Sequence, residues 1–138
     1  MAMKKYIVDV IVAYIVFAVL WTVYAMALME PQMAAMGDLM HPQDHPNQMV
    51  VLVWHFIQTL VMVWFWHKGL GSDQVKDGLI FGLMYGLLIG ASDMVWYYGM
   101  AIPQDPKSLM FIGHLVISGI VGGGLAKLYP KPAGDETA

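Results

Sequence analysis

Residues 78–102 read GLIFGLMYGLLIGASDMVWYYGMAI, and this stretch decides the fold class of the chain. Its only charged residue is Asp93, and about 20 mostly apolar residues are enough for a helix to cross the hydrocarbon core of a bilayer. Glycine recurs at every fourth position and so marks one face of such a helix: Gly78, Gly82, Gly86 and Gly90. Small residues let helices approach closely in lipid. We therefore predict a transmembrane helix over 78–102 that packs through this glycine face.

Three other apolar runs are long enough to span a bilayer, at residues 6–29, 49–66 and 109–128. The first of them has an alternative, because its basic start and the sequence Ala25-Met26-Ala27 are also features of a cleaved signal peptide. Its apolar core is longer than the roughly 7 to 15 residues that signal peptides use, which favours a retained span.

The predicted fold is therefore all-α, a four-helix transmembrane bundle formed by a single domain over residues 1–138. Residues 30–48 connect the first two spans, and residues 129–138 form a C-terminal tail. The composition supports this class, since 59% of the residues are hydrophobic and 12% are charged. Cysteine is absent, which excludes disulfides and thiolate metal sites. Without arginine or a basic stripe, we expect no nucleic-acid partner.

The lysines predict the orientation in the membrane. One side of the four predicted spans carries six of them: Lys4, Lys5, Lys68, Lys76, Lys127 and Lys131. The opposite side carries only Lys107. Because cytoplasmic loops hold the excess of lysine in multi-pass proteins, we predict that both termini are cytoplasmic and that residues 30–48 lie outside.

Small residues also mark the fourth predicted span, where Gly119 and Gly123 repeat the four-residue spacing. A short sequence similarity between residues 20–32 and residues 95–104 indicates a possible internal repeat. It is compatible with a parallel duplication of a helical hairpin, of the kind seen in some transporters. The expected partners are the lipid bilayer and a second copy of the chain or a larger membrane complex.

Ionisable residues from three predicted spans occupy one depth in the membrane. His55, Asp93 and His114 each lie roughly 8 to 9 Å inside the outer boundary, at 1.5 Å of rise per residue. Gln58 follows His55 by three positions and Ser118 follows His114 by four, so each histidine has a polar neighbour on its own helix face. Charged groups in hydrocarbon are costly and usually paired, which makes this level a candidate functional site.

Four interpretations of this polar level stay open. Asp93 can bond one or both histidines and fix the rotation of the helices, or the three groups can line a proton or solute path. Two imidazoles can also ligate haem, and two histidines with one aspartate match a non-haem iron site, so a haem or transition-metal cofactor is an alternative. The fourth is an intramembrane enzyme site, for which the sequence holds no nucleophile motif.

A second candidate metal segment lies between the first two spans. Met33, Met36 and Met40 continue a helical spacing that begins at Met29, and His41 and His45 follow them. Thioethers with imidazoles suit copper(I). An interfacial amphipathic helix with a pliable methionine face is the favoured alternative.

Two polar residues at the lysine-rich end receive a structural interpretation. His67 lies beside Lys68 at the inner end of its span, where an imidazole can reach water. Asp9 lies one turn after Lys4 and Lys5 and is expected to act as an interfacial carboxylate.

The segments Leu20-Trp21-Thr22-Val23-Tyr24, Gly86 to Asp93 and Gly113-His114-Leu115 resemble small bacterial four-helix membrane protein families of unknown function. The resemblance implies a multi-pass protein of the bacterial inner membrane and carries no functional residue. For the function, a non-enzymatic structural or accessory subunit is expected first. A small proton-coupled or solute transporter is the alternative, and a haem- or metal-binding electron-transfer protein is the third.

Overall fold

The computed structural model describes residues 3–39, 41–42, 44–99 and 104–128. All elements in this part of the chain are helical, in the order α1 (Met3–Tyr24), η1 (Ala25–Met29), α2 (Glu30–Met36), η2 (Gly37–Leu39), α3 (Asn47–Phe65), η3 (Trp66–Leu70), α4 (Val75–Gly99) and α5 (Gln104–Leu128). Four stretches are long and apolar enough to cross a membrane: Met3–Met29, Asn47–Leu70, Val75–Gly99 and Ser108–Leu128. The predicted class, an all-α multi-pass membrane protein, is confirmed at this level.

Each of the four long helices begins before the predicted start of its span, and the second span also ends later. The second span continues beyond Trp66 as the π-helix η3, which ends at Leu70. The third begins at Val75, three residues before the predicted start, while residues 100–102 lie outside the described residues. An apolar pattern marks the part of a helix that lies in hydrocarbon, and polar residues at the ends extend the helix without extending that pattern.

The methionine segment begins as predicted with a short helix, α2. Gly37 ends this helix with a positive φ of 42°, a conformation that glycine adopts at no steric cost. Met29 is buried and Met33 and Met36 are half-buried, which agrees with an apolar face on the methionine side of α2. Met40 lies outside the described residues.

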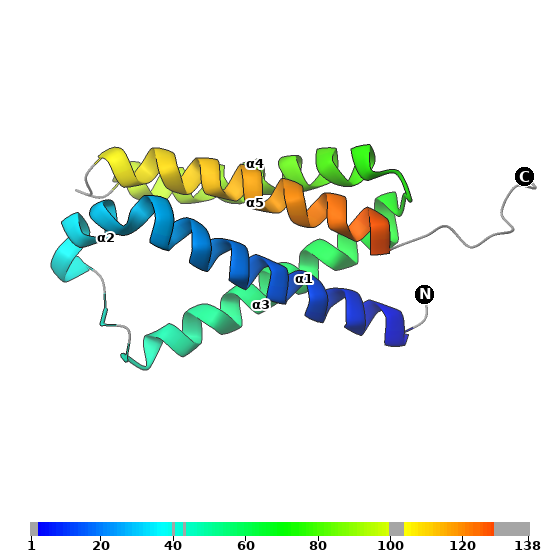
Figure 1. Ribbon diagram of the computed structural model, residues 1–138, viewed down its shortest axis with the longest axis horizontal. Helices are drawn as coiled ribbons and strands as arrows, with labels where there is room; N and C mark the ends of the chain where they lie inside the picture. Colours follow the sequence, from blue (N-terminus) through cyan, green and yellow to red (C-terminus); the bar gives the residue numbers. More distant parts are fainter. Residues whose placement is uncertain (1–2, 40, 43, 100–103, 129–138) are drawn as a thin grey trace, which may run out of the picture.

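The glycine face of α4 packs directly on α5, side by side with it in Figure 1. A Cβ atom added at Gly78 would overlap the Gly122 carbonyl oxygen, and one added at Gly82 would overlap the Ser118 carbonyl oxygen. Gly119 and Gly123 receive the side chains of Leu83 and Leu79 from α4. The two backbones therefore touch along these glycines.

Helix α1 is tied to its neighbours by tyrosine hydroxyl groups. Tyr6 and Tyr14 donate hydrogen bonds to the backbone carbonyls of Leu60 and Leu52 on α3, at 3.0 and 3.2 Å. Tyr24 donates one to Leu109 on α5, at 2.7 Å. In lipid, a hydroxyl group needs such a partner inside the protein, so these bonds fix which helices meet α1.

The two ends of the bundle differ in packing. At the end that holds the start of α1 and the end of α5, an apolar core joins α1, α3, η3 and α5: Val10, Ala13, Met62, Val63, Trp66, Val121, Leu125 and Ala126. Toward the other end, α1 and α3 spread apart (Figure 1). Many large apolar side chains point outward from all four spans, where they are placed to contact lipid.

Candidate functional site: an intramembrane cavity with an aspartate and histidine pair

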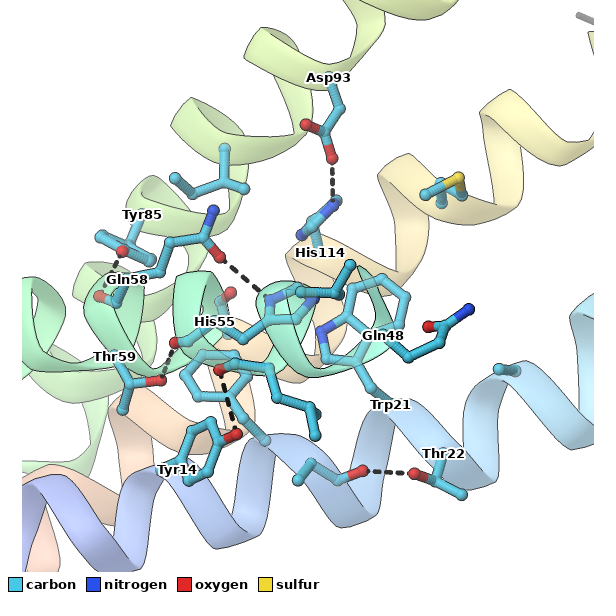
Figure 2. Close-up of a pocket in the computed structure, with 18 of the residues that line it drawn as sticks. Tyr14, Trp21, Thr22, Gln48, His55, Gln58, Thr59, Tyr85, Asp93 and His114 are labelled. Atoms are coloured by element: carbon cyan, nitrogen blue, oxygen red, sulfur yellow. Dashed lines mark hydrogen bonds and ion pairs between the residues drawn. The ribbon is translucent and has the colours of Figure 1, made fainter. Parts of the chain in front are cut away.

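A cavity of about 540 Å³ lies between α1, α3, α4 and α5, and Figure 2 shows residues that line it. The ribbons of α1 and α3 spread apart on this side of the bundle (Figure 1). It extends from Gln48, in the first turn of α3, to Thr59 on the same helix. Eleven residues of α-helix rise roughly 16 Å, about half the thickness of a hydrocarbon core. The cavity therefore reaches about half-way into the predicted membrane region, and the apolar core closes its inner end.

All members of the predicted polar level line this one cavity: His55, Gln58, Asp93, His114 and Ser118. The direct contact is between Asp93 of α4 and His114 of α5, which point toward each other in Figure 2. The Nε2 atom of His114 lies 2.7 Å from the Oδ2 atom of Asp93. We call these two residues the cavity pair.

The glycine face sets the geometry of the cavity pair. The backbone carbonyl of His114 lies on Gly86, and the Cβ atom of His114 lies beside Gly90, one turn before Asp93. A larger residue at either glycine would push α5 away from α4. The short distance within the pair therefore depends on the small residues that precede Asp93.

The two members of the pair differ in exposure. The Asp93 side chain keeps 36% of its surface exposed, whereas His114 keeps 10%. Trp21 of α1 covers the imidazole, with the two ring centroids 4.8 Å apart and the planes inclined by 67°. His114 is thus held between α1 and α4. The side chain of Asp93 lines the cavity and is partly exposed there.

His55 belongs to a separate group on the same cavity. Its Nδ1 atom lies 3.2 Å from Oε1 of Gln58, and the hydroxyl group of Tyr85 donates to the Gln58 backbone carbonyl at 2.7 Å. The structure thus brings Asp93 to one histidine and places the other with glutamine. Among the described residues, no three histidine, cysteine, aspartate or glutamate side chains are grouped so as to hold a metal ion.

The two histidines of the connecting segment lie together. The rings of His41 and His45 are stacked, 4.0 Å apart and inclined by only 5°. Asn47 holds both, because its side chain lies 3.1 Å from Nε2 of His41 and its backbone N–H donates to Nδ1 of His45. These contacts join both histidines to the first residue of α3.

A second aspartate and histidine pair, which is buried, is formed by two residues that were expected to lie at the membrane interface. Nε2 of His67 lies 2.8 Å from Oδ2 of Asp9, and Nζ of Lys5 lies 3.0 Å from the same oxygen. The side chains of Asp9 and His67 are 4% and 0% exposed. Lys5 also donates to the backbone carbonyl of Leu128, so both ends of the described chain meet here. We call Lys5, Asp9 and His67 the N-terminal cluster.

A signal for this cluster was present in the sequence. Asp9 follows Lys5 by four positions, the spacing of a helical ion pair, and His67 lies at the same end of the neighbouring antiparallel span. Their shared position at one end of two adjacent spans indicates that Asp9 and His67 can meet.

Replacing Asp9 by alanine is expected to lower the free energy of unfolding by about 3 kcal/mol, because it removes one partner of a buried ionic pair. Asp9→Asn, which keeps an acceptor, should cost less. Thermal unfolding in a mild detergent measures both. The control is Asp73→Ala, which removes an exposed carboxylate from the loop before α4. Equal midpoints for Asp9→Ala and Asp73→Ala would show that the cluster does not stabilise the bundle.

No family model, no curated protein and no solved structure matches this chain, so the evidence on its function is the arrangement of its own residues.

Proposed function

We propose that the chain is a small membrane carrier that binds a solute in the cavity in exchange for a proton on the cavity pair. The observation that carries the proposal is the exposed Asp93 carboxylate, bonded to His114 at 2.7 Å on the wall of a cavity of about 540 Å³. Pockets for small molecules fall between about 300 and 1,000 Å³ and combine apolar walls with a few placed polar groups.

Proton exchange follows from the chemistry of the pair. Histidine normally titrates between about pH 5 and 8, and gain of its proton changes the charge of the pair by one unit. Inside a membrane protein this change is large in energy, because the surroundings have a low dielectric constant. A solute that contacts Asp93 therefore binds the two protonation states with different affinity, and such a difference couples two ligands thermodynamically.

The shape of the bundle supports access from one side at a time. The apolar core, with Met62, Val63 and Trp66 of the second span, closes the end of the bundle near the N terminus. The positive-inside rule assigns that end to the cytoplasm, so the cavity faces the outside in this arrangement. We assign α4 and α5 to a rigid unit, because their backbones touch, and α1 with α3 to the part that moves.

A cysteine scan tests whether the cavity contains water. The natural chain has no cysteine, so single cysteines can be introduced without background. Ala18 lines the cavity, whereas the adjacent Val19 is 56% exposed and does not line it. A water-soluble methanethiosulfonate reagent should modify Ala18→Cys at least about tenfold faster than Val19→Cys, because the reactive thiolate forms in water and not in lipid. Equal slow rates would exclude a water-filled cavity and, with it, the carrier.

The other functions expected from the sequence have their own tests. An accessory subunit predicts copurification with larger partners and loss of assembly in His55→Ala or His114→Ala. A haem protein predicts a Soret absorption band that either substitution removes. A colourless, iron-free and monodisperse preparation would count against both.

A further inference from the structure

We infer that the occupant of the cavity is an organic monocation with an aromatic or otherwise apolar body. The inference rests on the proposed carrier function and names its substrate class. It is argued from the charge of the cavity wall, from the rings on that wall and from the position of His114.

The charge of the wall favours a cation. Among the described residues that line the cavity, Asp93 is the only carboxylate, and neither lysine nor arginine is present. With His55 and His114 neutral, the formal charge of the wall is therefore −1. A single negative charge at this depth is costly unless a positive charge accompanies it. An anionic occupant would add a second negative charge beside Asp93.

The cavity wall also carries aromatic side chains, the type of group that binds organic cations. Five aromatic side chains from α1 and α4 line the cavity: Tyr14, Phe17, Trp21, Tyr85 and Tyr97. Aromatic faces attract cations, most strongly when water is excluded, and recognise quaternary ammonium groups in particular. A cavity wall that combines aromatic side chains with one carboxylate matches an occupant whose charge is permanent and whose remaining surface is apolar.

His114 explains how such a cation would exchange with a proton. Its imidazole lies between the Asp93 carboxylate and the ring of Trp21, which is a favourable place for a positive charge. When His114 is protonated, the pair is neutral overall and needs no further cation. When His114 is neutral, the charge of Asp93 is available to the occupant. The proton and the organic cation therefore compensate the same charge and exclude each other.

Two thiol reagents of opposite charge test the inference on Ala18→Cys in the full chain in proteoliposomes. One carries a trimethylammonium group and the other a sulfonate group on the same methanethiosulfonate. We compare the rate of the cationic reagent divided by the rate of the anionic reagent. For Ala18→Cys this ratio should be about tenfold higher than for a free thiol in solution. Benzyltrimethylammonium should slow the modification, and benzenesulfonate should not.

Asp93→Asn in the Ala18→Cys background should return the rate ratio to that of a free thiol, and Asp93→Glu should keep most of the preference. The second variant retains the charge, so it separates a lost charge from a damaged fold. If both reagents react rapidly with Ala18→Cys and the ratio of their rates equals that of a free thiol, the inference of a cationic occupant is wrong. The proposed water-filled cavity and the carrier function are not contradicted by that result. If Ala18→Cys reacts no faster than Val19→Cys with either reagent, the carrier itself fails.

Discussion

Gly82→Leu is expected to separate α4 from α5 and to abolish the cooperative unfolding of the bundle. A side chain at this position has no space, because even a Cβ atom would overlap the backbone carbonyl of Ser118. Backbone atoms cannot rotate away as a side chain can, so the helices have to move apart. Overpacking costs about 1 to 3 kcal/mol where neighbours can adjust, and more is expected here.

Because transmembrane helices are stable individually, Gly82→Leu should keep its helix content while losing tertiary packing. Far-ultraviolet circular dichroism measures the first property, and thermal unfolding in detergent measures the second. The control is Gly124→Leu on α5, where an added Cβ atom meets nothing within 4 Å. Identical unfolding of the two variants would show that the glycine face of α4 is not a helix contact.

Asp93→Asn is expected to lower the uptake of benzyltrimethylammonium into proteoliposomes with an acidic interior by about tenfold or more. The acidic interior drives protons outward, and the proposed exchange moves the cation inward. The substitution removes the charge that both ligands compensate. Two unit charges about 4 Å apart attract each other by about 4 kcal/mol at an effective dielectric constant of about 20, and about 1.4 kcal/mol already corresponds to tenfold in affinity. Radiolabelled cation measures the rate, and Asp73→Asn in the exposed loop is the control.

His114→Gln separates proton exchange from cation binding. Glutamine can donate a hydrogen bond to Asp93 but cannot gain a proton between pH 5 and 8. Binding of the cation to wild-type protein should weaken as the pH is lowered, because a protonated His114 compensates Asp93. Binding to His114→Gln should not change with pH, and uptake should no longer respond to the pH gradient. A wild-type pH dependence that persists in this variant would assign the exchanged proton to another group.

The candidate site was predicted in part. Counting residues from the membrane boundary placed Asp93 and His114 at one depth, and their 2.7 Å contact agrees with this expectation. That the glycine face meets α5 is seen only in the structure. The association of His55 with Gln58 was predicted as a neighbour relation along one helix and is found as one. The N-terminal cluster was missed, because Asp9 and His67 were considered separately on their own helices.

The sequence by itself determined the four apolar helices and the glycine face of α4. A helix needs a minimum number of apolar residues to cross a bilayer, and its faces repeat every 3.6 residues. Both features can therefore be recognised within a single segment of the sequence. Tertiary structure decided which histidine Asp93 bonds, that Asp9 meets His67, and that α1 and α3 leave a cavity. These outcomes depend on the rotation and relative depth of helices that are separate in the chain. Contacts between helices, such as those of Trp21, Tyr14 and Tyr24, determine that rotation and depth, and they form only when the helices have met.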